Sequence, residues 1–107
     1  MPLHEDHVRE ALKQVIDPEL FVNIVDLGLI YVVDVEAIDG EDDKYNINIE
    51  MTMTSPMCPA GPQLVAETRK YAGELDSVEN VEVKVVMEPQ WTQDMMTDDA
   101  RDQLGIF

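Results

Sequence analysis

The first 28 residues carry one helical pattern followed by a loop. Apolar residues recur at intervals of three and four, the spacing of one face of an α-helix. These residues are Val8, Ala11, Leu12, Val15 and Ile16. The pattern predicts a helix over residues 4–16, ending at Asp17-Pro18 because the residue before a proline avoids the helical region. Residues 19–28 have no clean period and predict an ordered loop, in which Gly28 allows a tight bend.

Two alternating segments follow and predict a β-hairpin. Residues 30–38 are rich in β-branched side chains, and their apolar side is Tyr31, Val33, Val35 and Ala37. Residues 45–53 alternate more cleanly, with Tyr45, Ile47, Ile49, Met51 and Met53 on one face and Asn46, Asn48, Glu50 and Thr52 on the other. Asp39-Gly40 between the two runs is a turn signal typical of hairpins, and the acidic residues 41–43 belong to the same loop.

Three prolines between residues 56 and 62 end the second strand and introduce another helix. This helix begins near Pro59 or Pro62, since proline is tolerated in a first helical turn. Its apolar face is Leu64, Val65, Thr68, Tyr71, Ala72 and Leu75. A third alternating strand carries Val81, Val83, Val85 and Met87 and stops at Glu88-Pro89. A short helix over residues 98–104 completes the chain, with Thr97 as its N-cap and Gly105 at its end.

The order of elements predicts the architecture. The first two strands form an antiparallel hairpin, and the second helix crosses back over the sheet with the usual right-handed connection. Both long helices then pack on the face that carries Tyr45, Ile47 and Ile49. We therefore predict a two-layer α+β fold of α-β-β-α-β order with a short C-terminal helix, forming a single domain over residues 1–107.

Composition narrows the class of partner and compartment. Acidic residues number 23 against 7 basic ones, giving a formal net charge of −16, which disfavours nucleic acid and anionic membrane surfaces. No apolar run approaches the roughly 18 residues that span a bilayer. The single cysteine excludes an intrachain disulfide, and the N-terminus has no signal-peptide pattern, so we expect a cytoplasmic protein. The acid excess fits either a solvated surface or a salt-loving host.

Cys58 is the strongest candidate for chemistry. It lies between the predicted second strand and second helix, with Pro56 and Pro59 beside it. The N-terminus of a helix stabilises an anion, so a thiol placed there is a better nucleophile or metal ligand. The ordinary alternative for a free cysteine is a small buried hydrophobe. The flanking prolines present one side chain rigidly and favour the functional interpretation.

Hydroxyl and carboxylate groups provide candidate neighbours for this thiol. Thr54 and Ser55 precede Cys58 and either hydrogen-bond a sulfur species or stabilise the turn. Asp17 and Glu19 either do acid–base work, bind a hard cation, or simply end the first helix. His4 and His7 stand one helical turn apart, but no thiol is near them in the sequence, so we expect no metal site there.

Four blocks of the sequence, in the same order, closely resemble the metal-sulfur cluster biosynthesis family. They are Ala11–Leu20, Val25–Tyr31, Met53–Pro59 (Met-Thr-Ser-Pro-Met-Cys-Pro) and Glu88–Thr92. The resemblance covers about residues 8–106 and includes SufT-like and PaaD-like members; the chain lacks the extra C-terminal cysteines frequent in the PaaD-like ones, which favours the SufT-like type. It implies an iron–sulfur cluster assembly domain that serves as an accessory or carrier, without turnover of its own. The implied partners are the Fe–S assembly machinery and apo Fe–S client proteins.

The resemblance also implies a site. Its cofactor-binding residues would be Asp17, Glu19, Thr54, Ser55 and Cys58, with Cys58 as the metal ligand and a transient iron–sulfur cluster or iron as cargo. A cluster usually takes four thiolates and one chain supplies one, so a homodimer would supply two and a partner or small thiol the rest.

Two alternatives remain open at this point. One is a thiol enzyme with Cys58 as nucleophile and Asp17 or Glu19 as base. The other is an interaction domain whose acidic face docks a basic partner. Because a hairpin places the start of its first strand beside the end of its second, the composite site predicts Asp17 or Glu19 within about 8 Å of the Cys58 sulfur.

Overall fold

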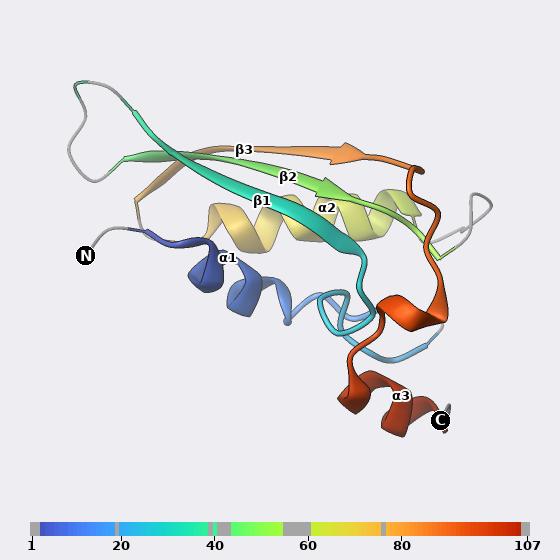
Figure 1. Ribbon diagram of the computed structural model, residues 1–107. Coiled ribbons are helices and arrows are strands. Elements are labelled where there is room, and N and C mark those ends of the chain that lie inside the picture. The colour runs from blue at the N-terminus through green and yellow to red at the C-terminus, as the bar shows by residue number, and fades with distance from the viewer. Residues whose placement is uncertain are drawn as a thin grey trace.

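The computed structural model describes residues 3–18, 20–38, 40, 44–54, 61–75 and 77–105. The elements are α1 (Glu5–Leu12), β1 (Ile30–Ala37), β2 (Tyr45–Met51), α2 (Gly61–Gly73), β3 (Val78–Val85), a 3-10 turn η1 (Gln93–Met95) and α3 (Asp98–Leu104). The three strands form one sheet with β2 in the centre, and α1 and α2 lie together on one face of it (Figure 1). The predicted two-layer α+β fold is confirmed.

The sheet is mixed. β1 pairs antiparallel with β2, whereas β2 pairs parallel with β3. The helix α2 connects β2 to β3 and carries the chain back, so that these two strands run in the same direction. On the face covered by the helices, Ile47 and Ile49 are 1% exposed and Met51 is fully buried. The helical residues that the sequence assigned to the apolar face of α2 include the fully buried Leu64, Thr68 and Ala72. Alternation along β2 and periodicity along α2 therefore identified the core correctly.

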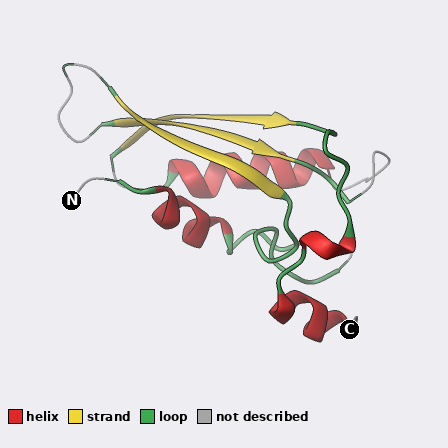
Figure 2. Cartoon of the chain, viewed as in Figure 1, coloured by secondary structure: helices red, strands yellow, loops and turns green. Residues whose placement is uncertain are grey.

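The first helix is shorter than predicted. α1 ends at Leu12, not near residue 16, although Val15 is fully buried as the helical pattern requires. The Val15 carbonyl accepts a hydrogen bond from Ile24 at 3.0 Å. Ile16 pairs with Asn23 in an isolated antiparallel bridge and is 45% exposed. The backbone groups of Val15 and Ile16 therefore pair with residues of the following loop instead of extending the helix. Figure 2 shows this loop after α1.

Other boundaries differ by a few residues. β3 begins at Val78 and ends at Val85, so Met87 lies beyond the strand. β2 ends at Met51, and Thr52, predicted on the polar face, is fully buried. Within the predicted hairpin turn, Gly40 has a positive φ of 79°, while Asp39 and residues 41–43 lie outside the described part of the chain.

The C-terminal helix matches its prediction at both ends. The Thr97 hydroxyl accepts a hydrogen bond from the Ala100 N–H at 3.2 Å, and Gly105 ends α3 with a left-handed φ of 73°. The Thr97 N–H donates to the Asp26 carbonyl at 2.9 Å, which ties the start of α3 to the loop before β1. Among the described residues, the helices are too short or too polar to cross a membrane.

Residues 86–97 run back from β3 to pack against the loop that precedes β1 (Figure 1). The Trp91 indole N–H donates to the Leu27 carbonyl at 2.7 Å, and the Tyr31 hydroxyl donates to the Pro89 carbonyl at 2.8 Å. Gly28, with φ of 82°, approaches the Met95 backbone so closely that a Cβ would overlap it. The tight bend predicted at Gly28 is therefore also a packing contact.

Candidate functional site

Asp17 is a buried carboxylate held in a tight turn. It is only 2% exposed, although an aspartate belongs to the residue types that usually face water. Its Oδ1 accepts a hydrogen bond from the Leu20 N–H at 3.1 Å, and its carbonyl accepts one from Phe21 at 2.8 Å. Phe21 has a positive φ of 60° and is 78% exposed, so the turn is strained at this residue. A buried carboxylate needs such partners to offset its lost hydration.

A relay of backbone hydrogen bonds connects this turn to the end of β2. The Ile24 N–H donates to Val15, the Leu29 N–H donates to Ile24, and the Thr52 N–H donates to Leu29. The three N···O distances are 3.0, 3.0 and 2.8 Å. The Asp17 turn is therefore fixed to the end of the central strand, two residues before Thr54.

Two threonines follow the end of β2. Thr52 is fully buried, and its hydroxyl has no hydrogen-bond partner among the residues that the structure describes. Thr54 is half-buried. Leaving a buried hydroxyl unpaired costs free energy, so Thr52 is a point of local destabilisation at the end of β2. Alternation alone placed Thr52 on the polar face with Asn48 and Glu50. The structure instead buries it where its N–H extends the β1–β2 pairing to the Leu29 carbonyl.

The start of α2 lies next to the end of β2. Gly61, the first helical residue, faces the Met53 side chain, whose sulfur would lie 3.7 Å from a Cβ built on the glycine. Pro62 occupies the first turn, as predicted, and this turn contains no acidic residue. The positive end of the α2 dipole is thus not offset by a carboxylate within its own first turn, which favours a negatively charged group nearby.

The structure describes part of the predicted site. Asp17 and Thr54 lie in described segments, and the relay above connects the regions that contain them. Glu19, Ser55 and Cys58 lie outside the described residues, so the distance from Asp17 or Glu19 to the Cys58 sulfur stays a prediction. Within the described segments, no three His, Cys, Asp or Glu side chains form a group suited to a metal ion.

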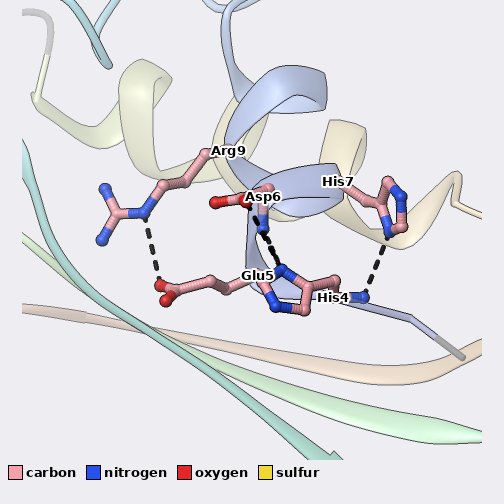
Figure 3. A network of polar contacts seen from close by, with 5 residues as sticks. All are labelled: His4, Glu5, Asp6, His7 and Arg9. Atoms are coloured by element: carbon pink, nitrogen blue, oxygen red, sulfur yellow. Dashed lines mark hydrogen bonds and ion pairs between the residues drawn. The ribbon is translucent and has the colours of Figure 1, made fainter.

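The two histidines take part in the N-terminal cap of α1 (Figure 3). The His4 Nδ1 accepts a hydrogen bond from the Asp6 N–H at 3.3 Å, and the His7 Nδ1 accepts one from the His4 N–H at 3.2 Å. Glu5 forms an ion pair with Arg9 at 3.5 Å on the same helix. These contacts give both imidazoles a structural task at the helix start.

The fold is that of a small α+β domain in which backbone hydrogen bonds connect a buried carboxylate turn to the end of the central strand. Residues 5–85 match the model of a family described as "Iron-sulfur cluster assembly protein", and the chain belongs to this family. The resemblance found in the sequence blocks is thereby confirmed.

Relatives and a solved structure agree with this assignment. The chain is 42% identical over 102 residues to the "Fe-S protein maturation auxiliary factor YitW" of Bacillus subtilis (strain 168), covering 95% of this chain and 94% of the relative. It is 41% identical over 92 residues to the "Fe-S protein maturation auxiliary factor SufT" of Staphylococcus aureus (strain USA300), covering 86% and 98%. The solved structure of a "Domain of Unknown Function DUF59" from Bacillus anthracis superposes with a TM-score of 0.84 at 38% identity, covering 96% and 92%.

Proposed function

We propose that this protein is an iron–sulfur protein maturation factor, acting as an accessory or carrier that helps load apo client proteins and does not turn over a substrate. Membership of the assembly family and two relatives named as maturation auxiliary factors support this proposal. The structural observation that carries it is the relay that fixes the buried Asp17 turn to the end of β2, immediately before the segment that contains the only cysteine.

Cys58 is the ligand in this proposal, with iron or an iron–sulfur cluster as cargo. The 107 residues contain one cysteine, so a cluster with four thiolate ligands would take its remaining ligands from a second copy, a client or a small thiol. A cluster held mainly by exchangeable ligands is released more readily than one held by four thiolates of a single chain. Such a ligand set suits transfer rather than storage.

Asp17, Glu19, Thr54 and Ser55 complete the proposed site. The carboxylates would attract a cationic metal centre, because their charge is opposite to that of the metal. They would also disfavour a free Cys58 thiolate, because two negative charges repel each other. The hydroxyls would donate hydrogen bonds to sulfur. The chain's net charge of −16 further raises the local concentration of cations.

A depletion and rescue experiment tests the function. In cells depleted of the endogenous protein, we measure the activity of aconitase, which needs a cluster, and of lactate dehydrogenase, which does not. Wild type restores aconitase and leaves lactate dehydrogenase unchanged, whereas Cys58→Ser fails to restore aconitase and Asp17→Asn restores it incompletely. Asp34→Asn is the matched control, because Asp34 is an exposed carboxylate of β1 on the face opposite to the buried Val33. Full rescue by Cys58→Ser would overturn the role of this thiol.

A further inference from the structure

A groove lies beside the start of β1, away from the Asp17 turn. Its volume is about 600 Å³, within the range of roughly 300–1,000 Å³ that is typical of ligand pockets. Val32 and Glu50, which are paired across β1 and β2, form one wall, and Val86 and Pro89 from the segment after β3 form another. In Figure 1 this segment descends from the end of β3 past the start of β1.

The groove has an exposed apolar side chain in its lining. Val32 is 42% exposed although it lies within β1, and Val86, which faces the same groove from the segment after β3, is half-buried. Covering Val32 and Val86 together would remove apolar surface from water, which is favourable.

The groove is acidic as well as apolar. Glu50 and Glu88 contribute carboxylates to its lining, and none of the described residues that line it is basic. Lys84, which lies opposite Glu50 in the strand register, forms no ion pair with a described residue. An occupant that carries positive charge would therefore complement the two carboxylates of the lining.

The lining is held in place before anything binds. The Tyr31 hydroxyl donates to the Pro89 carbonyl at 2.8 Å and also lies 3.3 Å from the Met95 sulfur. Both of these residues line the groove along with Tyr31 itself. Trp91 anchors the same segment to Leu27. A preformed groove loses little conformational entropy when an occupant enters.

We propose that this groove binds an extended segment of a partner protein in which an apolar side chain is flanked by lysine or arginine. The apolar side chain covers Val32 and Val86, and the basic side chains pair with Glu50 and Glu88. A second copy of this chain is a poor occupant, because the chain has 23 acidic and 7 basic residues and two copies repel each other. The inference does not depend on the proposed iron–sulfur role, since it uses no residue of that site.

Peptide titration followed by NMR tests the proposal. The full-length ¹⁵N-labelled protein is titrated at low salt with the acetylated, amidated peptide Lys-Leu-Lys-Leu-Lys. We expect concentration-dependent shifts of the Tyr31, Val32, Glu50 and Glu88 amide signals. A peptide with serine in place of leucine tests the apolar contact, and a peptide with glutamate in place of lysine tests the pairing of charges. The serine peptide should bind more weakly, and the glutamate peptide should not bind.

Variants locate the binding. Glu50→Gln and Glu88→Gln should each weaken binding by about two- to fivefold, the range for solvent-exposed ion pairs. Glu82→Gln is the control, because Glu82 is an exposed carboxylate of β3 that does not line this groove. Equal binding of the leucine and serine peptides, shifts centred elsewhere, no shifts at all, or shifts of the groove amides with protein concentration alone would overturn the proposal.

Discussion

Thr52 and Thr68 are both fully buried, but they differ in one hydrogen bond. The Thr68 hydroxyl donates to the Leu64 carbonyl at 2.7 Å, whereas the Thr52 hydroxyl has no partner within the described segments. An unpaired buried hydroxyl lowers the stability of the folded state, while a paired one raises it. The two threonines therefore differ in hydrogen bonding at equal burial.

We expect Thr52→Val to raise the free energy of unfolding by about 1 kcal/mol, because valine has nearly the same shape and leaves no polar atom unpaired. Thr68→Val is the matched control and should lower it by about 1 kcal/mol. Urea denaturation followed by circular dichroism measures both. If Thr52→Val destabilised the protein as much as Thr68→Val, the Thr52 hydroxyl would have a partner in solution and the comparison would fail.

The two ends of α1 show how elements are limited by their neighbours. Its N-terminus is closed by the imidazoles of His4 and His7. Its C-terminus is at Leu12 because the N–H groups that follow, those of Lys13, Gln14 and Val15, donate to carbonyls three residues back instead of four. The first feature was missed from the sequence because histidine is an uncommon N-cap. The second could not be predicted from periodicity, because Val15 is buried whether or not its backbone is helical.

His4→Ala should speed amide hydrogen exchange in the first turn of α1, since the Asp6 N–H loses its acceptor. His4→Ser restores a side-chain oxygen at the N-cap and should retain protection. Exchange measured by NMR at Asp6 and His7 distinguishes the variants. Equal exchange in both would show that the His4 ring does not stabilise the helix start.

The junction between the C-terminal segment and the loop before β1 depends on Gly28. Gly28 and Gly40 have similar positive φ values of 82° and 79°, but only Gly28 faces a neighbour, the Met95 backbone. We expect Gly40→Ala to cost about 1–2 kcal/mol from its left-handed backbone, and Gly28→Ala to cost about 2–5 kcal/mol because overlap with Met95 is added. Thermal unfolding measures both, and equal losses would argue against the close packing at Met95.

The whole molecule carries far more negative than positive charge. Its net charge is −16, and the ion pairs found among the described residues, such as Lys44–Glu79 at 3.4 Å, lie at partly exposed positions where they add little. The sequence predicted this charge directly. It also predicted the α+β order of elements, because alternation and helical periodicity are local properties of the chain.

Salt should therefore stabilise the protein. Raising NaCl from about 10 mM to 500 mM shortens the Debye length from roughly 30 Å to a few ångströms and screens the repulsion among the carboxylates. The unfolding temperature should rise over this range at constant pH, with KCl giving the same increase as a control for ion identity. A constant or falling unfolding temperature would show that repulsion does not limit the stability of the folded state.

The candidate site was less predictable from the sequence than the fold. The sequence blocks selected Asp17 and Thr54, but not the burial of Asp17 or the relay through Leu29 that joins its turn to β2. The hairpin predicted that the start of β1 lies beside the end of β2, but the bonds from Leu29 to Ile24 and from Ile24 to Val15 depend on the fold of the loop, which no periodic pattern encodes. The groove beside Val32 was also missed, because it forms only where the segment after β3 passes β1.

The central claim is that Cys58 binds the cargo. The most direct measurement is anaerobic reconstitution of wild type and Cys58→Ser with iron and sulfide, followed by visible absorbance and by counting protein-bound iron and sulfide. Wild type should gain the broad absorbance of an iron–sulfur chromophore with bound iron and sulfide, and Cys58→Ser should lose both while keeping the same fold by circular dichroism. Identical iron binding and absorbance in the two proteins would contradict the account.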